Sequence, residues 1–291
     1  MGESGPGERG RGARLVILSA LAWSTAGLFT KGSAADAWAV LFWRGIFAGP
    51  LMLLYLRLWV REPFWPSCRA LGWPGWLVVT VASCTTIAFL NAFKLTSIAN
   101  VTMIYATAPF AAAALGWLLL GERPRAGAIL VSAAALVGVA IMVSGSLGTP
   151  SLAGDGLALL MTLLMALYLV LIRRFAARPM VLAAALSSLQ ISLIAWPLSE
   201  TLWPGWSELA WLAAFGLVQA AAVVALTAGA RRLPAAECAL LSAMEVPLAP
   251  LLAWLVFGEL PPAATFVGGG LVLAGLFWYI GRDLRPAPAG R

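Results

Sequence analysis

The sequence has no histidine among its 291 residues, and only 12 of them are acidic. Without histidine, the histidine-based catalytic pairs and triads and the HExxH zinc site are excluded. A P-loop, a GxSxG elbow and a cluster of paired aspartates are also missing. Three cysteines occur, Cys68, Cys84 and Cys238, and no two of them have CxxC spacing. We therefore expect no enzyme active site, no metal, no cofactor and no disulfide framework.

Charge is scarce as well. Only 11% of the residues are charged and 62% are hydrophobic, whereas a soluble domain has about 25% charged and about 45–50% apolar residues. A water-soluble core could not absorb this excess, so the sequence predicts that lipid bilayer surrounds the chain. The net charge of +7 does not indicate a nucleic-acid partner, because the arginines recur in small groups between apolar runs.

Short breaks divide the chain into ten apolar runs of about 20 residues, the length that crosses a hydrocarbon core. The predicted spans are 14–32, 37–57, 74–93, 98–120, 126–145, 154–172, 180–199, 208–229, 235–257 and 263–281. No break is long enough for a separate soluble domain. We predict an all-α polytopic membrane protein with one transmembrane domain.

Basic residues fall on alternate sides of these spans very unevenly. Lys31 and Lys94 lie on one side, and Arg44 lies inside a span. The other side has Arg9, Arg11, Arg14, Arg57, Arg61, Arg69, Arg123, Arg125, Arg173, Arg174, Arg178, Arg231, Arg232, Arg282, Arg285 and Arg291. Because positive charge marks the cytoplasmic side, we predict that both termini are cytoplasmic.

Two stretches resemble each other at an offset of 137 residues. The matched pairs are Lys94 and Arg231, Ala99 and Ala236, Trp117 and Trp254, Gly121-Glu122 and Gly258-Glu259, and Gly138 and Gly275. The offset predicts two five-helix repeats, residues 14–145 and 153–283. Five is an odd number, so the second repeat must be inverted relative to the first. Inverted repeats around a midplane site are a recurrent transporter design, because two near-equivalent halves can open either face in turn.

The ten spans, the two Gly-Glu segments and the run Leu21-Ala-Trp-Ser-Thr25 resemble the drug/metabolite transporter superfamily, and within it the EamA-type members. Trp23-Ser24-Thr25, with Gly27 and the basic Lys31, is similar to the YddG-type amino-acid exporters. The resemblance covers nearly the whole chain. It implies a bacterial inner-membrane exporter of amino acids, aromatic or hydrophobic ones included, with a central cavity and with helices five and ten at the periphery.

Arg44 and Glu245 are the candidates for substrate binding that carry charge. Each lies about 12–15 Å from one end of its span at 1.5 Å per residue, and an arginine at the bilayer centre costs at least about 2.5 kcal/mol. We expect Arg44 to hold a substrate carboxylate and Glu245 to hold an ammonium group or a proton. Alternatively, the two charges pair with each other or with a broken helix. Pro109, Pro247 and Pro250 predict matched kinks in spans four and nine.

Polar and aromatic residues within the spans are further candidates for lining the cavity, because polar groups in a bilayer turn inward. Trp and Tyr are also common as interface anchors. The set comprises Trp23, Ser24, Thr25, Trp43, Asn91, Tyr105, Thr107, Tyr168, Gln190 and Gln219. Among the acids at span ends, we expect Glu122 and Glu259 to pair with basic neighbours or set gates, and Glu237 and Asp155 to be solvated.

The expected partners are a small-molecule substrate and the lipid bilayer. Proton coupling remains open, as does the choice between a monomer and a homodimer. An exporter of lipophilic cationic drugs or other metabolites is the first alternative. A channel, a receptor and a scaffold are alternatives of another class, which the inverted repeat disfavours.

Overall fold

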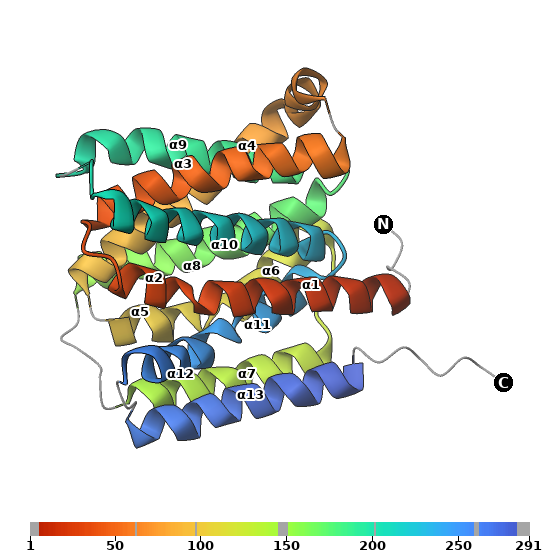
Figure 1. Ribbon diagram of the computed structural model, residues 1–291. Coiled ribbons are helices and arrows are strands. Elements are labelled where there is room, and N and C mark those ends of the chain that lie inside the picture. Colours follow the sequence, from red (N-terminus) through yellow and green to blue (C-terminus); the bar gives the residue numbers. More distant parts are fainter. Residues whose placement is uncertain are drawn as a thin grey trace.

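The structure is a computed structural model that describes residues 6–61, 63–96, 98–144, 151–200, 202–258 and 262–283. All regular secondary structure within these ranges is helical, and ten helical segments there are long and apolar enough to cross a membrane. The predicted fold class is therefore confirmed. The chain is a multi-pass membrane protein, with its helices running nearly parallel to one another (Figure 1).

Some of the ten spans are built from two helices each. The elements of the first half are α1 Pro6–Ser24, α2 Ala26–Lys31, α3 Ala37–Tyr55, η1 Leu56–Val60, α4 Phe64–Leu95, α5 Ile98–Tyr105, α6 Ala108–Leu120 and α7 Ala126–Val143. Those of the second half are α8 Leu152–Arg174, α9 Met180–Ala195, η2 Trp196–Leu198, α10 Trp206–Ala230, α11 Ala235–Ser242, α12 Glu245–Phe257 and α13 Ala263–Asp283.

Spans four and nine repeat each other in their helix bounds. Both α5 and α11 have eight residues, both α6 and α12 have 13, and the four helices begin and end 137 positions apart. Gly121 and Gly258 end the second helix of each span with φ of 70° and 71°, a left-handed conformation that glycine adopts without strain. The repeat seen in the sequence thus extends to the backbone.

The kink predicted in span nine lies earlier than Pro247 and Pro250. The helix breaks at Ala243–Met244, and α12 begins at Glu245. A proline in the first turn of a helix needs no intrahelical donor. The break therefore places Pro247 where its missing N–H costs little, and Pro109 lies likewise at the start of α6.

Span three also differs from the prediction, because helix begins at Phe64 rather than at residue 74. Gly72 interrupts it with φ of 54° and ψ of −173°, which separates a short helical turn from the long span. Arg178 donates hydrogen bonds to the carbonyls of Ala70 and Leu71 at this corner. Glycine permits the corner because residues with a side chain rarely adopt this conformation.

The principal helix contacts join the two halves: α4 packs on α8, α3 on α9, α1 on α10, and α7 on α13. Figure 1 shows α7 and α13 side by side at the lower edge of the bundle, as expected for spans five and ten. A side chain on Gly138 would lie 2.7 Å from the carbonyl of Gly268, so small residues set this close approach.

Opposite ends of the bundle differ in charge. The arginines at the start of α1 and α7 and at the end of α8, α10 and α13 gather at one end, the basic face, where Arg173 donates to the carbonyl of Arg231 and Arg9 donates to the hydroxyl of Tyr279. The opposite face carries Asp36, Asp155 and Glu208 at the starts of α3, α8 and α10. Because Arg9 in α1 and Tyr279 in α13 are in contact, the first and last described helices meet at the basic face.

Candidate functional site

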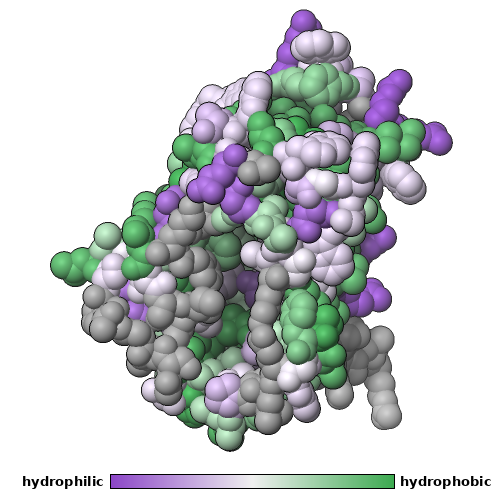
Figure 2. Space-filling view, turned by 60° about the vertical axis from the view of Figure 1, so that its left-hand side comes forward, coloured by the Kyte–Doolittle hydropathy of each residue, from purple (hydrophilic) through white to green (hydrophobic). Residues whose placement is uncertain are grey.

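The candidate site lies where the broken spans meet. Helix α12 packs against α1, α2 and α13, and α11 packs against α6. Figure 2 turns the face opposite the basic residues toward the viewer and shows a hollow at the height of α2, α5 and α12, with apolar side chains visible inside it. Helix breaks free backbone groups from intrahelical bonding, and in membrane proteins such breaks are tolerated where they line a cavity.

Tyr105 and Glu245 face each other across the two matched breaks. Tyr105 is the last residue of α5 and Glu245 the first residue of α12, and their side chains are hydrogen-bonded. The α12 N-terminus favours a carboxylate in its first turn, because the unpaired N–H groups there carry partial positive charge. Tyr105 thus lies beside one of the charged candidates.

Arg44 lies in α3, and its guanidinium carbon is 5.5 Å from the centre of the Phe215 ring of α10. Phe215 in turn stacks on Phe29 of α2, with ring centres 4.9 Å apart. A cation over an aromatic face gains on the order of 0.5–2 kcal/mol, which offsets only part of the cost of burying an arginine in a membrane. Among the described residues, no carboxylate forms a salt bridge with Arg44.

Arg44 and Glu245 do not form a salt bridge with each other in this structure. Helix α2 of the first span contacts α10, which carries the Phe215 ring beside Arg44. It also contacts α12, which begins with Glu245. The first span thus packs against an element next to each of the two charged candidates.

The first span contributes Trp23 and Ser24 next to its break. Trp23 packs against a cluster formed by α3, α9 and α10, which includes Met52, Ala184 and Val223. Ser24 is buried, and its hydroxyl donates to the carbonyl of Leu21 at 2.7 Å. Thr25 does the same to Ala22. These hydroxyls bond to the preceding turn, a pattern that bends helices.

Four other candidates already have internal partners. The Trp43 indole donates to the carbonyl of Leu202 at 2.6 Å, which ties α3 to the segment before α10. Asn91 donates to the carbonyl of Ile87, one turn back in α4. Gln190 accepts a hydrogen bond from Ser83, and Tyr168 is buried in the main core.

Two polar candidates remain. The hydroxyl of Thr107 donates to the carbonyl of Ile104. Gln219 is buried, and its amide oxygen has no described hydrogen-bond partner.

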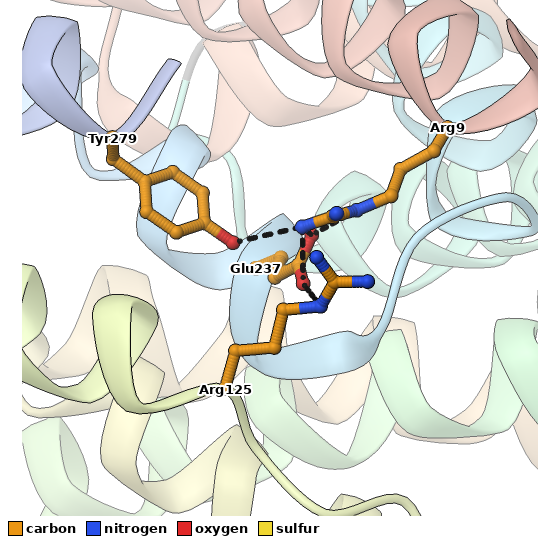
Figure 3. Close-up of polar contacts among 4 residues, drawn as sticks. All are labelled: Arg9, Arg125, Glu237 and Tyr279. Carbon is orange, nitrogen blue, oxygen red and sulfur yellow. Dashed lines mark hydrogen bonds and ion pairs between the residues drawn. The ribbon is translucent and has the colours of Figure 1, made fainter. Parts of the chain in front are cut away.

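The expectation that Glu237 is solvated was wrong. Its side chain is 1% exposed, and Arg9 donates to both carboxylate oxygens at 2.8 Å. Arg125 approaches to 3.5 Å, and the Tyr279 hydroxyl lies beside Arg9 (Figure 3). Sequence position alone placed Glu237 at a span end. Burial arises because four separate elements, α1, α11, α13 and the start of α7, converge on it.

The remaining acids are only partly as predicted. Glu122 forms the expected ion pair, with Arg173 at 3.0 Å. Asp155 is not simply solvated, because it accepts hydrogen bonds from Thr96 at 2.7 Å, from Asn100 and from the Ser151 amide. Glu259 lies outside the described residues.

Known proteins resemble this chain both in sequence and in fold. The sequence model of the EamA-like transporter family matches residues 10–144 and again residues 152–281. A solved crystal structure of a protein is similar over 95% of this chain and 98% of that chain, with a TM-score of 0.79 and 20% sequence identity. At that identity the likeness concerns the fold alone. None of the curated proteins matches the sequence.

Proposed function

Because the chain belongs to the EamA-like transporter family, we propose that this small-solute transporter exports amino acids through a cavity at the helix breaks. The observation that carries the proposal is the presence of Arg44 and Glu245, two partly buried groups of opposite charge that do not form a salt bridge with each other. A zwitterion supplies the complementary pair. A carboxylate binds Arg44 in a charge-assisted, bidentate contact, and an ammonium group binds Glu245 beside Tyr105.

The orientation of the chain in the membrane is proposed from its charge. The basic face is proposed to be cytoplasmic because positive charge is retained on that side, which places both termini in the cytoplasm of a bacterial cell. The hollow in Figure 2 then opens outward. Alternating access would close it while the cytoplasmic end opens around the same two charges.

Flux into proteoliposomes tests the substrate class. A labelled hydrophobic amino acid should be transported and should be displaced by other amino acids. Its decarboxylated amine, which lacks the group that binds Arg44, should compete at least about tenfold less well, the expected value of one lost charge-assisted contact. Equal competition by amine and amino acid contradicts the proposed clamp.

A second candidate function is export of lipophilic cations. It is favoured by the apolar interior of the hollow and by the hydrogen-bonded Glu245–Tyr105 pair, which can hold a cation or a proton without Arg44. The same assay separates the two, because a lipophilic cation would be transported equally well by the wild type and by Arg44→Ala.

A further inference from the structure

At the basic face, every long-range salt bridge of the described residues joins one half of the molecule to the other. Arg9 and Arg125 of the first half bind Glu237 of the second. The other two pairs are Arg173 with Glu122 and Arg232 with Glu8. In an inverted-repeat transporter, contacts between halves at one face must break for that face to open.

Glu237 is the most enclosed of these acids. It is 1% exposed and Arg9 is 12% exposed, whereas Glu122 is 23% and Glu8 is 54% exposed. Figure 3 shows Arg9 and Arg125 reaching Glu237 from different helices, with Tyr279 closing the far side of Arg9. A buried pair is screened little by solvent, so its loss matters more than the loss of an exposed pair.

The repeat places a neutral counterpart at the opposite face. Asn100 lies 137 positions before Glu237, and Thr96 lies 137 positions before Leu233. A side chain on Gly12 would meet Arg232 and Leu233, and one on Gly154 would meet Leu95 and Thr96, the same positions 137 apart. The contact of α1 with the start of span nine is therefore the repeat equivalent of the contact of α8 with the start of span four.

The two equivalent contacts differ in the chemical groups that join the halves. At the opposite face the halves are joined by hydrogen bonds from neutral groups, Thr96 and Asn100, to Asp155. Two further cross-half bonds there, from Ser199 to Asp36 and from Ser33 to Glu208, also have hydroxyl donors. Among the described residues, the basic face is thus held by ion pairs, of which Arg9–Glu237 is buried, whereas Asp155 at the repeat-related position is held by hydroxyl and amide groups.

Cys238 lies directly behind Glu237. It is fully buried, in the same core cluster as Tyr168 and Ala106, the residue that follows Tyr105 of the candidate site. A reagent from the basic face can therefore reach the Cys238 thiol only if the packing around Glu237 opens.

From these contacts we infer that Glu237, held by Arg9 and Arg125, is the gate residue of the basic face. The contacts of Asp155 form the repeat-related gate of the opposite face. Because the Glu237 gate is the stronger of the two, the basic face is closed at rest. The inference deepens the proposed function and rests on its alternating access. Glu237 is a positioning residue, since it holds helices and does not contact the candidate site's charges.

The native thiol of Cys238 reports on this gate. In a variant lacking Cys68 and Cys84, purified in detergent, maleimide modification of Cys238 is timed without any transport measurement. Glu237→Gln should raise the modification rate at least about tenfold, because both arginines lose their anion and the open state gains population. Asp155→Asn is the matched control at the opposite face and should leave the rate within about twofold.

A milder variant guards against misfolding. Arg125 is 46% exposed, and Arg125→Gln leaves the Arg9–Glu237 pair intact, so the rate should rise about two- to threefold. If Glu237→Gln yields no folded protein, the absence of a rise in Arg125→Gln overturns the gate. Protection of Cys238 in a folded Glu237→Gln protein overturns it, and so does equal exposure in Asp155→Asn. Loss of flux in the Arg44 variants bears on the proposed function alone.

Discussion

The two halves of the molecule share a backbone plan and differ in where they place charge. Spans four and nine begin, break and end at residues 137 apart. Yet α12 begins with Glu245, while the matching first residue of α6 is Ala108. Likewise α3 carries Arg44, and its packing partner α9 has no charged residue. The two halves thus share their helix breaks, whereas the two charges of the proposed site come from different halves.

The largest effect should come from Arg44→Ala, which removes the positive member of this pair. Loss of a charge-assisted bidentate contact is expected to lower amino-acid flux per folded molecule about 30-fold or more. Flux in proteoliposomes, normalised to protein that elutes as a single peak, measures it. Arg44→Lys is the matched control and should retain part of the activity. Normal flux in Arg44→Ala would make Arg44 a structural residue.

Glu245→Gln should have the next largest effect, with a different selectivity. The amide keeps the shape and the hydrogen bond to Tyr105 but loses the charge, so amino-acid flux should fall about tenfold. Transport of a carboxylate without an ammonium group should fall less. An equal loss for both solutes would indicate that Glu245 supports the helix break rather than the substrate.

Many of the features compared above could be predicted from the sequence. The ten spans, the inverted repeat and the position of Arg44 within a span follow from hydropathy, charge count and the 137-residue offset. The Tyr105–Glu245 contact and the burial of Glu237 did not follow, because each depends on which helices meet in space. Trp43 shows the same limit, since its neighbour Arg44 does not reveal that the indole bonds to Leu202.

Tyr105→Phe tests the contact between Tyr105 of the first half and Glu245 of the second half. The hydroxyl of Tyr105 hydrogen-bonds to Glu245, and its removal should weaken amino-acid transport about threefold while leaving the ring in place. The concentration dependence of flux measures the change. Tyr168→Phe is a useful control, because Tyr168 is a buried core residue and its substitution should leave flux nearly unaltered.

The smallest effect tests the shared backbone itself. Gly121→Ala and Gly258→Ala each place a side chain in a left-handed conformation, at positions where no other atom lies within 4 Å of the new carbon. Each should destabilise the protein by about 1 kcal/mol, from backbone strain alone. Thermal melts in the same detergent should show two equal shifts. Clearly unequal shifts would mean that the two helix ends are not equivalent.

The cross-half packing of α4 on α8, α3 on α9 and α1 on α10 also bears on how the protein is made. When the ribosome has finished only the first five spans, the surfaces that α8, α9 and α10 will cover still face lipid. These contacts can therefore form only after α8, α9 and α10 have been synthesised. Packing of the first half is thus completed late in biogenesis, and neither half is a finished template for the other.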